Sequence, residues 1–192
     1  MKIVFATGNP HKVEELKAIA DSCGRSDIEF VLPPKNFNPI EDGETFEENS
    51  YIKAKEANKL TKMISLADDS GLCVEALEGG PGIHSARYAD SPQARIDKLL
   101  NAIDSSKNRK AKFVCAMTLL DEKGNIIFQT RGECHGEIAK EQSGKNGFGY
   151  DPVFLVENTK KTMAEMKEEE KNKISHRGNA LRKVLHFLSL EN

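Results

Sequence analysis

The sequence predicts an α/β fold with a mixed central sheet and flanking helices. A first apolar, β-branched run spans residues 2–7 and leads into Gly-Asn-Pro, and apolar side chains then recur at helical spacing from Val13 to Ala20. A second apolar run follows at 28–32. Because a strand, a helix and a strand in close succession are typical of helices packed on a sheet, this opening favours an α/β protein.

Capping signals delimit the first two helices. Asn9 is a suitable N-cap, Pro10 fits the first helical position, and Gly24 can adopt the left-handed conformation that ends a helix. Thr45 and Glu48 form a capping box for the second helix. Both helix starts are therefore defined by short-range chemistry.

The remaining elements follow from periodicity and turn formers. Apolar residues after Ser91 recur at helical spacing, and Gly124 marks the reversal of a long hairpin. We expect strands at 64–67, 112–120, 126–138 and 152–156, and helices at 46–63, 91–103, 164–172 and from 175 onward. Without a repeat or a flexible linker, residues 1–192 are expected to form a single domain.

Composition excludes several classes of protein. The 192 residues contain 28 Lys plus Arg and 30 Asp plus Glu, a net charge of -2, whereas binding to nucleic acid or to an anionic membrane requires a cationic excess. Four cysteines lie far apart and no secretory leader is evident, so reduced thiols and a cytoplasmic location are expected. No apolar run approaches the roughly 20 residues of a membrane span.

The segment 7–12 (TGNPHK) is the first candidate site, because a strand-to-helix junction presents free backbone N–H groups and the positive end of a helix dipole. Phosphate is the natural ligand there. Gly8 permits close approach of an anion, Thr7 and Asn9 offer side-chain hydrogen bonds, and Lys12 adds a charge. A capped turn with a surface lysine is the alternative interpretation.

A pair of carboxylates, Asp68 and Asp69, follows the strand predicted at 64–67. Side chains of adjacent residues diverge there, so one carboxylate can hold a metal or activate water while the other fixes the loop. Oxygen ligands without His or Cys favour magnesium, and an Asx turn is the alternative. On the helix predicted at 46–63, Lys53 can reach the same anion as Lys12, unless it is simply solvated.

Two later segments carry further candidates. In 148–152 (FGYDP), aromatic rings within a glycine loop can stack on a nucleobase, or can plug the loop against the core. In 175–178 (SHRG), His176 and Arg177 offer donors at a helix start that can read a carbonyl oxygen, or can serve as a capping residue and an ion-pair member.

Taken together, TGNPHK, ENSYIKA, ADDSGL, GGPGIHSARY, GFGYDPVF and EEKNKISHRG resemble the inosine triphosphate pyrophosphatase family. The resemblance runs from the first predicted strand to the last predicted helix. It implies two lobes around a long substrate cleft, a homodimer, and magnesium-dependent hydrolysis of ITP, dITP and XTP to the monophosphate and pyrophosphate, which removes these nucleotides from the pool.

The resemblance also implies roles for individual residues. Asp69 would be the metal-linked general base, and Glu41 would help to hold magnesium. The substrate contacts that it implies are Thr7, Gly8, Asn9, Pro10, His11, Lys12, Lys53, Ser70, Phe148, Gly149, Tyr150, Asp151, Lys171, His176 and Arg177. Two alternatives stay open: a pyrophosphatase of other modified nucleotides, and a nucleotide-binding sensor without turnover.

Overall fold

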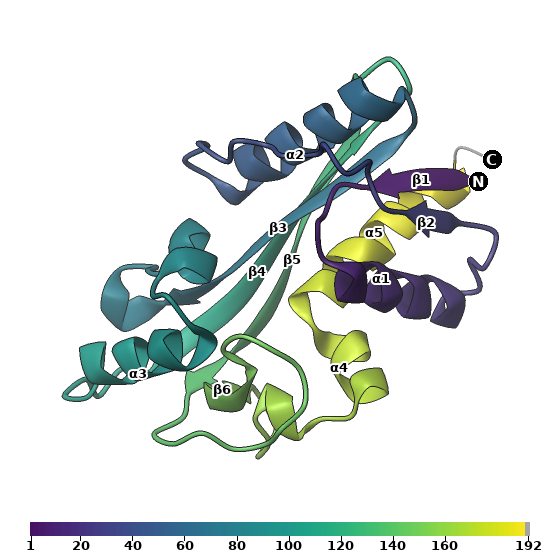
Figure 1. The fold of residues 1–192 in the computed structure, drawn as a ribbon. Helices are drawn as coiled ribbons and strands as arrows, with labels where there is room; N and C mark the ends of the chain where they lie inside the picture. The colour runs from purple at the N-terminus through teal and green to yellow at the C-terminus, as the bar shows by residue number, and fades with distance from the viewer. Residues whose placement is uncertain (191–192) are drawn as a thin grey trace. The chain divides into compact units, whose positions relative to one another are not determined.

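The computed structural model describes residues 1–190, which form a six-stranded sheet in the order β2-β1-β3-β4-β5-β6 with flanking helices (Figure 1). The strands are β1 (Lys2–Phe5), β2 (Glu29–Val31), β3 (Ser65–Val74), β4 (Lys110–Leu120), β5 (Ile126–Ile138) and β6 (Phe154–Val156). β1 pairs in parallel with β2 and β3, whereas β5 and β6 are antiparallel. The predicted α/β class with a mixed sheet is confirmed.

The helices largely match the expected ones. They are α1 (Pro10–Ser22), α2 (Phe46–Thr61), α3 (Pro92–Ala102), α4 (Glu168–Ile174) and α5 (His176–Leu190), with short 3-10 turns at Glu75–Leu77, Gly82–Arg87, Asp151–Val153 and Met163–Glu165. The Asn9 side chain caps α1, and Gly24 follows its end with a φ of 73°. Thr45 and Glu48 form the predicted capping box of α2.

The bounds predicted for one strand and one helix were wrong. The strand expected at 64–67 continues to Val74, so Asp68 and Asp69 lie within β3 and not after it. Basic side chains neutralise both carboxylates, and the strand therefore need not end where charge begins. The helix expected at 164–172 is divided into a 3-10 turn at Met163–Glu165 and the later helix α4.

The chain divides into two compact units, and β3, β4 and β5 contribute residues to both. The first unit contains 1–69, 115–132 and the described residues from 177 on; the second contains 70–114 and 133–176. Within residues 1–190, no helix is long and apolar enough to cross a membrane.

Each unit has its own apolar core. In the first, α1 and α5 bury residues such as Leu16 and Leu181 with Phe5 of β1, and a separate cluster packs Ala54 and Ala57 of α2 with strand residues. In the second, α3 contributes to a cluster that includes Phe113 and Phe154.

Candidate active site

The turn between β1 and α1 is closed by short-range hydrogen bonds. Thr7 Oγ1 accepts a hydrogen bond from Asn9 N at 3.1 Å, and Asn9 Oδ1 accepts one from His11 N at 3.0 Å. Gly8 is exposed, and a Cβ built there would meet no atom within 4 Å. Thr7 N and Lys12 N also donate to backbone carbonyls, so Gly8 is the residue of this turn whose backbone an anion can approach. Phosphate binding at this turn stays a prediction.

Lys12 extends from this turn to Asp68 of β3. Its Nζ lies 3.1 Å from both carboxylate oxygens of Asp68. On the same carboxylate, Arg177 Nε and Nη2 donate to Oδ2 at 3.1 and 3.0 Å. Burial alone would raise the pKa of Asp68, but the charges of Lys12, Arg177 and Lys53 hold it well below its usual range. Asp68 is therefore a buried, ionised anchor for two cations.

Arg177 is enclosed on its other side by Glu15 of α1. Its Nη1 donates to Glu15 Oε2 at 2.8 Å, and the side chain is only 2% exposed. Burial would lower its pKa, but Asp68 and Glu15 outweigh that effect and raise it. We predicted Arg177 as a donor to the ligand; in the structure its Nε, Nη1 and Nη2 each donate to an internal carboxylate, and its contact with a ligand stays a prediction. Sequence analysis missed Glu15, although it stands three positions after Lys12 and thus shares its helix face.

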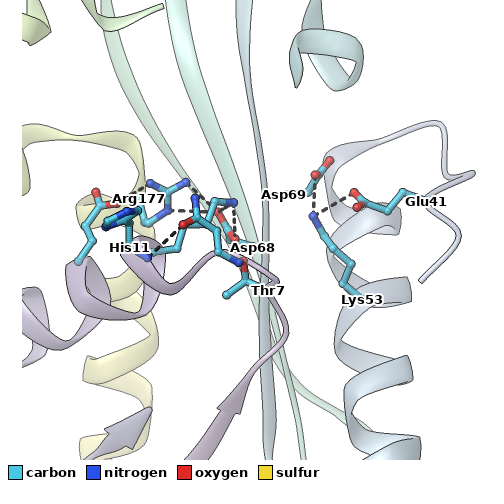
Figure 2. Close-up of polar contacts among 10 residues, drawn as sticks. Thr7, His11, Glu41, Lys53, Asp68, Asp69 and Arg177 are labelled. Atoms are coloured by element: carbon cyan, nitrogen blue, oxygen red, sulfur yellow. Dashed lines mark hydrogen bonds and ion pairs between the residues drawn. The ribbon is translucent and has the colours of Figure 1, made fainter. Parts of the chain in front are cut away.

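Asp69 points to the other side of β3 and meets a different cluster (Figure 2). Lys53 of α2 places its Nζ 3.0 Å from Asp69 Oδ1 and 3.0 Å from Glu41 Oε2. Burial, aided by the charges of Asp68 and Glu41, raises the pKa of Asp69 despite the opposing effect of Lys53. Burial would lower the pKa of Lys53, but the surrounding carboxylates raise it. The predicted group Glu41, Lys53 and Asp69 is thus assembled.

One atom of this group remains available to a ligand. Asp69 Oδ2 is buried and finds no hydrogen-bond partner among residues 1–190. An unsatisfied buried carboxylate oxygen is costly, so it indicates a place for a water molecule, a proton or a cation. Over the same residues, no three acidic, His or Cys side chains form a ready-made metal cage. Two carboxylates fit magnesium, which usually takes one or two from the protein and completes its shell with water and phosphate.

The second unit brings together the residues of the aromatic loop. Phe148 N donates to Asp151 Oδ2 at 3.0 Å, and Lys171 Nζ donates to the same oxygen at 2.6 Å. The Phe148 side chain is 51% exposed, with Lys171 Nζ at 4.7 Å from the centroid of its ring. Gly149 has a φ of 62° and open space where a Cβ would stand.

Tyr150 behaves unlike Phe148. It is 6% exposed, and its hydroxyl donates to Ser85 O at 2.8 Å. Burial raises the pKa of Tyr150 to about 12. The loop therefore combines both interpretations considered for its rings: Phe148 is presented to solvent, and Tyr150 plugs the loop against the core.

The last two predicted residues of this unit lie on separate elements. Ser70 follows Asp69 in β3. His176, at the start of α5, is 7% exposed and stacks on Phe113 of β4, with the ring centroids 4.8 Å apart and the planes inclined by 16°. The imidazole is held in a fixed plane by an apolar neighbour.

Fold and site define an α/β protein with a glycine-containing turn after β1. Its acidic pair is Asp69 of β3 and Glu41, and Lys53 contacts both carboxylates. The chain belongs to the Ham1 family, whose sequence pattern matches residues 3–187.

Similar proteins span nearly the whole chain. The dITP/XTP pyrophosphatase of Synechocystis sp. is 42% identical over 96% of this chain and 93% of its own, and that of Treponema denticola is 45% identical over 98% of each. Among solved structures, the Ham1 protein of Staphylococcus aureus superposes with a TM-score of 0.89 at 40% identity, covering 100% of both chains.

Proposed function

We propose that this protein is a nucleoside triphosphate pyrophosphohydrolase that converts ITP, dITP and XTP to the monophosphate and pyrophosphate. The observation that carries the proposal is the buried Asp69 Oδ2, which has no hydrogen-bond partner among residues 1–190, beside the Glu41 and Lys53 charges. Relatives with 42% and 45% identity are named dITP/XTP pyrophosphatases, which supports the same activity.

The triphosphate is bound by the first unit in this proposal. The exposed backbone at Gly8 lets phosphate oxygens approach the start of α1, and the Nζ atoms of Lys12 and Lys53 supply positive charge. Both ammonium groups are held by carboxylates in the structure, which fixes them before the substrate arrives. Cations positioned in advance lower the barrier because cleavage adds charge to the leaving pyrophosphate.

Asp69 acts as the general base. Its Oδ2 has no protein partner among residues 1–190 and can accept the proton of an attacking water, while Lys53 holds Oδ1 and so fixes the carboxylate plane. Glu41 and Asp69 would hold magnesium, which supplies Lewis-acid charge stabilisation to the phosphates when bound. Asp68 takes no direct part, because its oxygens are engaged by Lys12 and Arg177.

The nucleoside is assigned to residues of the second unit. Phe148 exposes a ring on which a base can stack, and His176 offers a donor for a 6-keto oxygen. Adenine carries an amino group at that position, and placing it against a donor costs about 1 to 3 kcal/mol. This mismatch disfavours ATP relative to ITP and XTP.

A substrate panel with detection of pyrophosphate tests the proposal. ITP, dITP and XTP should be cleaved with kcat/KM at least about tenfold above that of ATP, and the nucleotide product should be the monophosphate. Preference for dUTP would instead establish a pyrophosphatase of other nucleotides. Stoichiometric nucleotide binding without release of pyrophosphate would establish a sensor.

Magnesium dependence, dimerisation and a cytoplasmic location are parts of the same proposal. Chelation should abolish pyrophosphate release, and added Mg²⁺ should restore it. A homodimer predicts twice the chain mass in light scattering at assay concentration. A monomer that is fully active would remove dimerisation from the proposal and leave the catalytic assignment intact.

A further inference from the structure

Gly147 immediately precedes the exposed ring of Phe148 and is confined in two ways. Its φ of 73° lies in the left-handed region that favours glycine. A Cβ at this position would overlap Asp151 Oδ2 and come within 3.1 Å of Lys171 Nζ. The α-carbon of Gly147 is thus packed directly against an ion pair, and any other residue would push that pair apart.

This ion pair in turn holds Phe148. Asp151 Oδ2 receives both Lys171 Nζ at 2.6 Å and the backbone N–H of Phe148 at 3.0 Å. The Asp151 and Lys171 side chains are only 5% and 10% exposed. The same Nζ lies 4.7 Å from the centroid of the Phe148 ring, within the range of a cation–π contact. One buried oxygen and one ammonium therefore fix both the backbone and the ring of Phe148.

We propose that Gly147, Asp151 and Lys171 form a clamp that orients Phe148 for stacking on a nucleobase, with Gly147 as the positioning residue that lets the clamp close. The inference rests on the proposed function, and it changes the role of Lys171. The predicted direct contact of Lys171 with the substrate is replaced by an indirect one, in which its ammonium pairs with Asp151 and acts on the base through the Phe148 ring.

The clamp predicts a defect that depends on the base. A nucleotide loses stacking when Phe148 is misplaced, whereas inorganic tripolyphosphate has no base to lose. IMP, the expected product, and tripolyphosphate therefore separate the two parts of the ligand without requiring turnover. A general loss of structure would weaken the binding of both.

Gly147→Ala is the direct test, with Gly24→Ala as a matched control. Gly24 has the same φ of 73°, but a Cβ there would meet no atom within 4 Å. By calorimetry, Gly147→Ala should weaken IMP binding about tenfold, the scale of one base–aromatic stack, and leave tripolyphosphate binding unchanged. Gly24→Ala should alter neither. Equal losses for both ligands, or wild-type affinity for IMP, would overturn the clamp.

A double-mutant cycle with Phe148→Ala sharpens the test. Once the ring is removed, Gly147→Ala should cost nothing further in IMP affinity, because the clamp acts only through Phe148. If Gly147→Ala does not fold, Lys171→Met takes its place in the cycle with the same expectation, and an undiminished loss in the Phe148→Ala background would contradict the proposal. A wild-type protein that binds IMP but releases no pyrophosphate would reject the proposed function and leave the clamp testable.

Discussion

Asp68 and Asp69 are neighbours in β3, yet their carboxylates occupy opposite environments (Figure 2). Asp68 is bonded by Lys12 and Arg177, and these charges keep its pKa low. Asp69 bonds Lys53 through one oxygen and leaves the other unsatisfied among residues 1–190, while burial raises its pKa. The two residues share a chemical group and a strand, but differ in the number of cations that each one faces.

The difference shows that two adjacent residues of one strand can have different roles because they face different neighbours. Successive side chains leave a strand on opposite faces, so one aspartate meets the loop after β1 and the other meets α2. A carboxylate surrounded by cations is ionised and inert, which suits an anchor. A carboxylate that has one oxygen without a hydrogen-bond partner and a raised pKa can exchange a proton, which suits a base. The following predictions test this division.

The largest effect is expected for Asp69→Asn. Loss of the general base should reduce pyrophosphate release from ITP about 10³-fold. Removing a carboxylate whose ionised form is disfavoured by burial should change the free energy of unfolding by less than about 1 kcal/mol, because Lys53 retains Glu41. Initial rates and denaturant titration measure the two quantities. Near-normal turnover in this variant would contradict the assignment.

Asp68→Asn should have the opposite profile, with stability as the main loss. The substitution leaves the buried Arg177 with one carboxylate, Glu15, and frees Lys12, so we expect a loss of about 3 kcal/mol in the free energy of unfolding. Glu29→Gln is the control, because it breaks the exposed contact with Lys2 and should cost less than about 1 kcal/mol. Equal stability of the two variants would show that Asp68 is not an anchor.

The pH dependence of kcat/KM gives a smaller but diagnostic effect. Only ionised Asp69 accepts a proton, so kcat/KM should fall as pH drops through its pKa, by about tenfold per unit. Because the pKa of Asp69 is raised, the fall should begin above the ordinary range of a carboxylate, about 3.9. Rates across pH at the lowest magnesium concentration that supports turnover measure it, because a bound cation lowers the pKa of its carboxylate ligands. A profile that stays flat down to pH 4 would argue against Asp69 as the base.

Features that depend on nearby residues were predictable from the sequence. The caps at Asn9 and Thr45 use hydrogen bonds that span two or three positions, and the hairpin turn at 121–125 closes on itself. The grouping of Glu41, Lys53 and Asp69 also followed, because the family resemblance carried information on long-range proximity.

What the sequence did not reveal depends on distant partners. The burial of Arg177 requires Asp68, 109 positions away, and Glu15, 162 positions away. The contrast between Phe148 and Tyr150 arises because Tyr150 bonds Ser85, 65 positions away. The continuation of β3 beyond 67 likewise depends on cations from other elements that neutralise Asp68 and Asp69. No local pattern encodes these contacts.

The most direct test of the division between the two aspartates is a carboxyl ¹³C NMR titration of the metal-free protein, with Asp68→Asn and Asp69→Asn used for assignment. The Asp69 resonance should titrate with a midpoint above the ordinary value of about 3.9. The Asp68 resonance should remain that of an ionised carboxylate until the protein unfolds in acid. Two aspartates that titrate together near the ordinary value would contradict the account.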